Sequence, residues 1–153
     1  MRYRPYRPSD FEALYAIEMI CFEPPLRFPR KYMQRLTQSD QGVTWIAENQ
    51  TEMAGFAIVE WSRQLRGLVA YLATIEVQPG ERQQGVGSEL LRLVEQSALD
   101  AEAGLLWLHV DAENEVALRL YRRHGYAEVG RVVDYYGAGR AALAVWKPLR
   151  REP

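Results

Sequence analysis

The chain has 153 residues, of which 48% are hydrophobic and 25% charged, and this predicts one globular domain over residues 1–153. Its formal net charge of -1 argues against a nucleic-acid-binding protein, which normally carries a basic excess. Cys21 is the single cysteine, which excludes an internal disulfide, and a charged N-terminus with no long apolar run predicts a cytoplasmic protein without membrane spans.

The first part of the chain predicts one strand and two helices. Residues 1–6 contain a proline, which restricts this strand to the edge of a sheet. Ser9 is expected to cap a helix over residues 10–22, with Glu12 completing a capping box. A second, short helix is expected from Pro29 to about Leu36.

Three strands are predicted next, over Val43–Glu48, Met53–Trp61 and Leu68–Val77. The polar link at residues 49–52 indicates a hairpin between the first two. A glycine-containing turn then opens into an amphipathic helix that ends before Gly104.

A strand at Leu105–Val110 and a helix over residues 114–125 follow, and strands at about Ala127–Val133 and Ala141–Trp146 end the pattern. A run of antiparallel strands thus leads into β-α-β units. The expected fold class is α/β (α+β), with a mixed, mostly antiparallel sheet of six to seven strands and helices on both faces.

The turn Arg82-Gln83-Gln84-Gly85-Val86-Gly87 lies between a strand and a helix. Glycines let backbone N–H groups approach a ligand closely, and a helix N-terminus favours phosphate. The turn is neither a Walker loop nor the three-glycine dinucleotide fingerprint. Taken alone, it fits an ordinary glycine-softened turn equally well.

In its context the turn resembles the acetyl-CoA-binding motif of the GCN5-related N-acetyltransferase (GNAT) superfamily, and the segment from Asn114 to Tyr126 resembles that family's second motif. The resemblance implies a GNAT fold, acetyl-CoA as co-substrate and no metal. The implied cofactor-binding residues are Ile75, Val77, Arg82, Gln83, Gln84, Gly85, Val86, Gly87, Ser88, Asn114 and Tyr121. An oxyanion-stabilising N–H is implied from a strand bulge near Ile75 to Val77.

Asn114 and Tyr121 are seven residues apart and share one helix face. By itself Tyr121 fits a core aromatic residue. The resemblance implies that Asn114 contacts the pantetheine arm and that Tyr121 acts as general acid toward the leaving thiolate.

The candidates for the base are His109, Tyr71, Glu76 and Glu60. Alternation along its strand puts His109 on the face of Trp107, where a structural role is an open alternative. Glu76 has the opposite parity to Tyr71 and is expected to face away from it.

A finer resemblance connects the chain to protein N-terminal α-amine acetyltransferases. The bacterial branch, which acetylates a ribosomal-protein alanine, has a glutamate where this chain has His109. The branch of the NatE catalytic subunit has a histidine that pairs with a tyrosine fourteen residues before the first motif glycine, which here is Tyr71. The resemblance to this second branch implies that His109 and Tyr71 deprotonate the incoming amine through water.

Four residues are candidates for a peptide groove. Tyr135 and Tyr136 match a tyrosine pair that lines the groove in the resembling enzymes, and Phe28-Pro29 matches a substrate-pocket segment. An ordinary aromatic pair in a hairpin is the alternative for Tyr135 and Tyr136.

The sequence therefore predicts an acetyl-CoA-dependent N-acetyltransferase that transfers directly to a protein N-terminus, as a monomer or homodimer. The alternatives are acetylation of a small-molecule amine (an amino acid, polyamine or antibiotic), a non-catalytic acyl-CoA sensor and a general phosphate-ligand domain.

Overall fold

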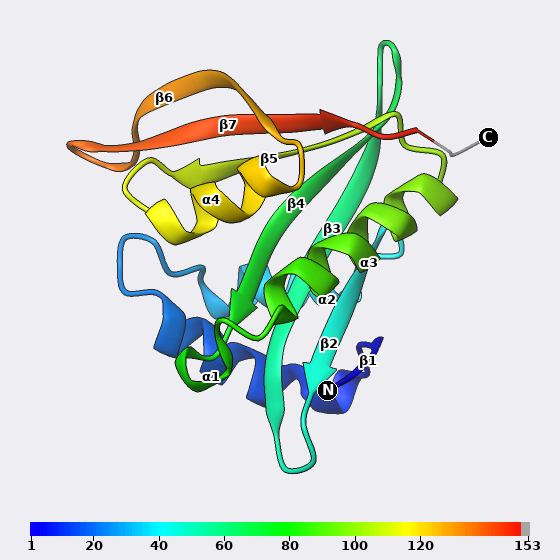
Figure 1. Cartoon of the computed structure of the whole chain (residues 1–153), viewed down its shortest axis with the longest axis vertical. Helices are drawn as coiled ribbons and strands as arrows, with labels where there is room; N and C mark the ends of the chain where they lie inside the picture. Colours follow the sequence, from blue (N-terminus) through cyan, green and yellow to red (C-terminus); the bar gives the residue numbers. More distant parts are fainter. Residues whose placement is uncertain (151–153) are drawn as a thin grey trace.

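The computed structural model describes residues 1–150, so the end of the predicted domain, 151–153, lies outside the described residues. Seven strands form one sheet in the order β1-β2-β3-β4-β5-β7-β6 (Figure 1). The strands are β1 (Arg2–Pro5), β2 (Gly42–Glu48), β3 (Met53–Gln64), β4 (Gly67–Val77), β5 (Leu105–Asp111), β6 (Ala127–Gly137) and β7 (Arg140–Pro148). The helices are α1 (Phe11–Cys21), α2 (Arg30–Gln38), α3 (Val86–Asp100) and α4 (Glu115–Arg123), with short 3-10 turns η1 (Pro8–Asp10) and η2 (Pro79–Glu81).

The predicted fold class is confirmed. Every neighbouring pair of strands is antiparallel except β4 and β5, and β1 lies at an edge as its proline requires. β4 connects to β5 through α3, because parallel strands need a crossover.

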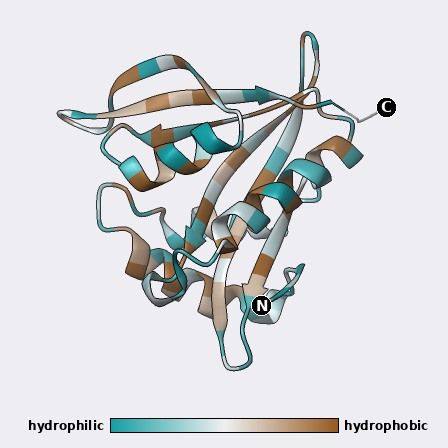
Figure 2. Cartoon of the chain, viewed as in Figure 1, coloured by the Kyte–Doolittle hydropathy of each residue, from teal (hydrophilic) through white to brown (hydrophobic). Residues whose placement is uncertain are grey.

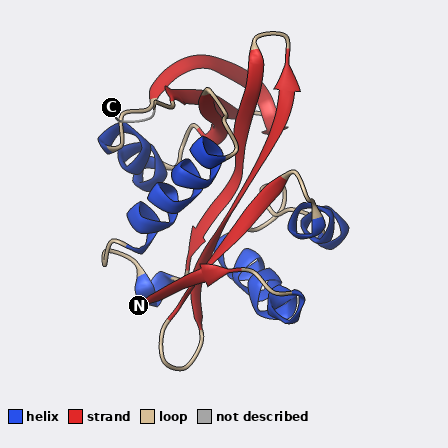
Figure 3. Ribbon diagram, turned by 90° about the vertical axis from the view of Figure 1, so that its right-hand side faces the viewer, coloured by secondary structure: helices blue, strands red, loops and turns tan. Residues whose placement is uncertain are grey.

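The helices form two layers, one on each face of the sheet (Figure 3). On one face, α3 and α4 cover a cluster that includes Leu90, Leu106 and Leu118. On the other face, α1 and α2 cover a cluster that includes Leu14, Met33 and Phe56. Hydrophobic and hydrophilic residues are interspersed along α3 and α4, as expected of amphipathic helices (Figure 2). None of the helices within residues 1–150 is long and apolar enough to cross a membrane.

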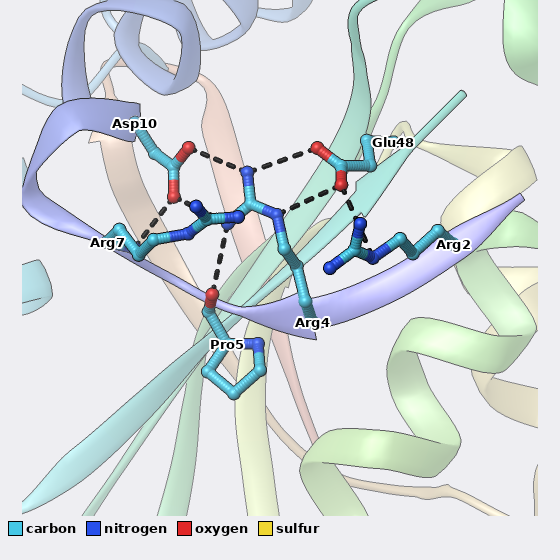
Figure 4. Close-up of polar contacts among 6 residues, drawn as sticks. All are labelled: Arg2, Arg4, Pro5, Arg7, Asp10 and Glu48. Atoms are coloured by element: carbon cyan, nitrogen blue, oxygen red, sulfur yellow. Dashed lines mark hydrogen bonds and ion pairs between the residues drawn. The ribbon is translucent and has the colours of Figure 1, made fainter. Parts of the chain in front are cut away.

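The predicted capping box at the first helix is wrong. Ser9 lies inside η1, and α1 begins at Phe11 without a side-chain cap. Asp10 makes the local bond instead, since its Oδ2 accepts from the backbone N–H of Arg7 at 2.7 Å. The same carboxylate accepts hydrogen bonds from both terminal nitrogens of Arg4, each at 2.8 Å, and Arg4 also binds Glu48 of β2 (Figure 4). A long-range ion-pair network therefore replaced the local cap.

β4 and β5 separate soon after they meet. They pair only at Ala70 with Leu106 and at Tyr71 with Trp107, and the two strands then diverge (Figure 1). The edge of β4 that faces β5 is consequently free of a strand partner from residue 72 onward.

A bulge in β4 lies at Ala73, two residues before the predicted position. Ile58 of β3 pairs with Thr74 and Val59 pairs with Leu72, so Ala73 is the extra residue. An extra residue reverses the alternation of all that follow it. The expectation that Glu76 faces away from Tyr71 is therefore wrong.

Register with β3 gives the face of each residue after the bulge. Glu76 lies opposite Phe56 on the α1 side of the sheet, the side on which Tyr71 lies. Ile75 packs on the α3 side instead.

Candidate active site

A cleft lies between the diverging strands and is lined by residues from both faces of the sheet. It is lined from the α3–α4 side by Leu72, Ile75, Leu108, Val110, Asn114, Ala117 and Tyr121. From the other side it is lined by a group that includes Tyr71, Ala73, His109, Tyr135 and Tyr136, and by four residues that we name the acceptor wall: Phe22, Leu26, Phe28 and Tyr32. Residues far apart in the chain thus meet where β4 and β5 are no longer hydrogen-bonded to each other.

Tyr71 and His109 are directly bonded across the two strands. The Tyr71 hydroxyl lies 2.8 Å from Nδ1 of His109. Trp107 packs edge-on against both rings, with centroids 4.8 Å from Tyr71 and 5.0 Å from His109. Tyr135 stacks on the His109 ring at 4.4 Å. The imidazole is therefore held in one orientation by contacts on several sides.

Burial sets the protonation of this pair. It lowers the pKa of His109 from its ordinary 6.5, so the ring is neutral at pH 7. Burial, with the neighbouring Tyr135 hydroxyl, raises the pKa of Tyr71, which therefore keeps its proton. A neutral imidazole bonded to a phenol can accept a proton directly on Nε2 or through the Tyr71 hydroxyl, depending on its tautomer.

Tyr121 reaches the cleft from α4 and is 4% exposed. Burial is the main cause that raises the pKa of its hydroxyl, and Tyr136 adds to it. Tyr121 consequently keeps its proton over the whole physiological range. Asn114 is the N-cap of α4, where its Oδ1 accepts from the Ala117 N–H at 3.1 Å. Its amide NH2 is left as the donor for a ligand in the cleft.

The other predicted substrate residues differ in their positions. β6 has four residues between its pairs Val132–Ala142 and Gly137–Arg140, where β7 has one, and this irregularity carries Tyr135 and Tyr136 over the cleft. Phe28 lines the cleft and packs against Tyr32 with centroids 5.0 Å apart.

Pro29 is the exposed N-cap of α2 and does not line the cleft. Its predicted contact with substrate is not supported by this position. Trp107 and Tyr32 were missed by sequence reasoning. Alternation already placed Trp107 beside His109, whereas only the tertiary packing of α2 reveals Tyr32.

The glycine turn forms the start of α3, on the other side of the bulged strand. Gly85 is the N-cap with a left-handed φ of 79°, and Gln83 also has a positive φ of 65°. The first N–H groups of a helix have no intrahelical acceptor, so residues 85–88 present donors at this end. Gly87 packs against α4, since a Cβ there would lie 3.6 Å from Leu120. The turn has the geometry of an anion cradle.

The side chains of the turn bond mainly within the protein. Arg82 and Gln84 are exposed, and Nε of Arg82 donates to the Val77 carbonyl at 2.9 Å. Val86 is buried, and Ser88 Oγ lies 3.0 Å from Nε2 of His124. The side chains of the turn thus differ in exposure, and the backbone N–H groups at the start of α3 are its common donors. Within residues 1–150, no group of three His, Cys, Asp or Glu side chains could hold a metal ion.

Known proteins resemble this chain in sequence. The model of the acetyltransferase (GNAT) family matches residues 11–126. Streptothricin acetyltransferase of Streptomyces lavendulae is 40% identical over 79 residues, which cover 52% of this chain and 41% of that protein. The N-alpha-acetyltransferase of Sulfurisphaera tokodaii is 26% identical over 157 residues, covering 97% of this chain and 93% of that protein.

Two solved structures share the fold over nearly the whole chain. The ribosomal-protein-S18-alanine N-acetyltransferase from Escherichia coli has a TM-score of 0.84 at 24% identity, covering 99% of this chain and 96% of its own. Arabidopsis thaliana NAA60 in complex with acetyl-CoA has a TM-score of 0.86 at 24% identity, covering 97% of this chain and 98% of its own.

Proposed function

The chain belongs to the acetyltransferase (GNAT) family, and from that premise we propose that it transfers acetyl from acetyl-CoA directly to the α-amine of a protein or peptide N-terminus, as a single domain. The observation that carries this proposal is the 2.8 Å bond between Tyr71 and His109 inside the cleft that Tyr121 also lines. Similarity to an archaeal N-alpha-acetyltransferase over nearly the whole chain supports the acceptor class.

The turn before α3 suits the pyrophosphate of acetyl-CoA. Its free N–H donors and the positive end of the helix dipole bind phosphate, and Gly85 adopts a φ of 79° that allows this approach. Asn114 and the unpaired edge of β4 near Ile75 would hold the amides of the pantetheine arm. The bound co-substrate supplies an activated acetyl thioester.

His109 and Tyr71 act on the incoming amine. An N-terminal ammonium gives up a proton, through water, to the neutral imidazole or to the Tyr71–His109 pair, and the freed nitrogen lone pair forms the new C–N bond. A backbone N–H on the free edge of β4 donates to the carbonyl oxygen as charge develops there. Tyr121 donates its hydroxyl proton to the sulfur as the C–S bond breaks. The nitrogen loses its second proton to solvent as the amide forms, and solvent returns one proton to the Tyr121 oxygen.

The weak base favours an α-amine over a lysine side chain. An N-terminal amine has a pKa of about 7.8 and lysine one of about 10.4, so at neutral pH the reactive neutral form is several hundredfold more abundant for the α-amine. A histidine whose pKa lies below 6.5 can assist the first much more readily than the second.

A small-molecule amine is the second candidate acceptor. The observation in its favour is the 40% identity to streptothricin acetyltransferase, which exceeds the identity to the N-alpha-acetyltransferase but covers only 52% of this chain.

A CoA-release assay with acetyl-CoA decides between the two acceptor classes. It compares peptides with free N-termini, the same peptides with blocked N-termini and an internal lysine, and a panel of free amino acids, polyamines and streptothricin. We expect the highest kcat/KM for free peptide N-termini and a large loss on blocking them. A preference for free small amines would refute the N-terminal acceptor, and no acetyl transfer to any amine would refute catalysis.

A further inference from the structure

Two carboxyl groups are buried against each other beneath the acceptor wall. Glu18 of α1 is 0% exposed and Glu76 of β4 is 3% exposed. The Ala73 bulge brings Glu76 to this face, where its carboxyl group neighbours that of Glu18. The mechanism above uses neither group.

Each carboxyl group has one satisfied oxygen and one orphan. Oε2 of Glu76 accepts from the Thr74 hydroxyl at 2.8 Å, and Oε2 of Glu18 accepts from the Phe28 N–H at 3.0 Å. Oε1 of both residues is buried without a donor among the described residues. One proton between these two Oε1 atoms would satisfy both, because the protonated oxygen donates and the ionised one accepts.

Within residues 1–150, no lysine or arginine forms an ion pair with either carboxyl group, so no bonded cation neutralises a second charge. Cys21 of α1 is a neighbouring titratable group, and Arg82 from the loop before α3 lies 3.5 Å from its sulfur. Arg27 of the α1–α2 loop donates to backbone carbonyls at the end of α1. β3 contributes the apolar ring of Phe56 opposite Glu76. Two adjacent carboxylates in such a site cannot both be ionised at neutral pH.

Glu18 connects this pair to the cleft. Phe28 is held by α1 on both sides of its backbone, since Glu18 accepts from its N–H and the Tyr15 hydroxyl donates to its carbonyl at 2.9 Å. The Phe28 ring then packs against Tyr32 in the acceptor wall. Displacing Glu18 from β4 would therefore move this wall.

We propose that Glu18 and Glu76 share one proton and that this carboxyl pair positions the acceptor wall, so that its loss at alkaline pH weakens binding of the acceptor amine. The inference rests on the proposed function for its substrate, but the shared proton does not depend on it. Glu18 and Glu76 are positioning residues, since they touch neither substrate nor reacting atoms.

The sign of the pH dependence follows from burial. Burial and the Glu18 carboxyl raise the pKa of Glu76 well above its ordinary value of 4.5. The pair is thus intact at acidic and neutral pH and is lost as pH rises through the raised pKa.

Kinetics of Glu76→Gln test the positioning role. The glutamine amide donates to Glu18 at every pH, as the shared proton does, while its carbonyl accepts from Thr74. We expect the acceptor KM of the wild type, divided by that of Glu76→Gln, to rise toward alkaline pH by up to about tenfold per unit above the pKa of the pair. This ratio cancels the titration of the amine itself. At each pH, the wild type and Glu76→Gln should have the same kcat and the same KM for acetyl-CoA.

Glu52→Gln is the matched control, because it removes an exposed carboxylate in the β2–β3 hairpin and should follow the wild type. Glu18→Gln should behave as Glu76→Gln does and serves if the first variant fails to fold. A wild-type to Glu76→Gln ratio that stays flat up to pH 9.5 would overturn the positioning role.

A measurement on the wild type tests the shared proton without any acceptor. Carbon-13 NMR of labelled glutamate carboxyls should show one resonance that titrates more than one unit above the ordinary pKa of about 4.3. If all glutamates titrate near that value, the shared proton is refuted whatever the enzyme acetylates. If peptides are not substrates, the kinetic comparison is made with the amine that is acetylated, so failure of the proposed function is recognised separately.

Discussion

A double-mutant cycle on Tyr71 and His109 tests whether the two residues act as one unit. Tyr71→Phe removes the hydroxyl that lies 2.8 Å from Nδ1 but keeps the ring that packs on Trp107. His109→Gln removes the basic nitrogens at a position of similar size. Loss of a general base typically lowers the rate by about a hundredfold or more.

The magnitude follows from the geometry. If a proton must pass through the bonded pair, either substitution interrupts the same path, and each should lower kcat/KM for a peptide by about 10²-fold at pH 7.5. The double variant should then lose about 10²-fold as well. Two independent contributions would multiply to about 10⁴-fold. The expected coupling is therefore about 2.7 kcal/mol, which is the free energy of a hundredfold rate difference.

The assay is CoA release from acetyl-CoA at a saturating co-substrate concentration, between pH 5 and 9. In the wild type, kcat should fall as pH drops through the lowered pKa of His109, below 6.5, because the ring must be neutral to accept a proton. This limb should be absent from His109→Gln. Multiplicative losses in the double variant, or an unchanged kcat of His109→Gln across this range, would refute the coupled base.

Three further predictions concern Tyr121, Gly85 and Arg4. Tyr121→Phe should keep the melting temperature and lower kcat by about tenfold to a hundredfold. An acetyl thioester of a more acidic thiol should restore part of the rate, because its thiolate leaves without a proton donor. An unchanged kcat would exclude the role of Tyr121 as an acid. Gly85→Ala should lower the free energy of unfolding by about 1 kcal/mol, because the φ of Gly85 is 79°, and should raise the KM for acetyl-CoA. Gly80→Ala is the control, since Gly80 has open space around it and no positive φ. Equal stability and KM of the two variants would contradict the strained turn. Arg4→Met should reduce the free energy of unfolding by about 1–3 kcal/mol in urea titrations at pH 7. Arg4 holds the pKa of Asp10 below its ordinary value, so this difference should shrink as pH falls below about 3.9, and a pH-independent difference would argue against the ion pair.

Local pattern predicted the face of a residue only where a strand is regular. β5 pairs with β7 in unbroken register, and His109 lies on the face of Trp107 as alternation requires. β4 contains an extra residue at Ala73, which depends on pairing with β3 and leaves no mark in the spacing of apolar residues. The same alternation therefore failed for Glu76.

Contacts between distant segments were similarly out of reach of local pattern. Ser9 and Glu12 form an acceptable capping box in sequence, but in the structure Asp10, just before α1, binds Arg4 of β1, which in turn binds Glu48 of β2. The four unpaired residues of β6 that bring Tyr135 over His109 are likewise a property of register. The order of strands and helices along the chain was predictable because each element carries its own hydrophobic period.

The cleft is lined from both faces of the sheet, so each of two reactants could approach it from its own side. A nucleotide-bearing thioester would enter beside α3 and α4, and an amine would enter beside α2 and the β6 irregularity, so neither has to leave before the other arrives. Substitutions on the acceptor wall can change which amine is accepted while the glycine turn stays as it is. A single compound that links a thioester-side group to an amine-side group across the gap between β4 and β5 would contact both walls of the cleft at once.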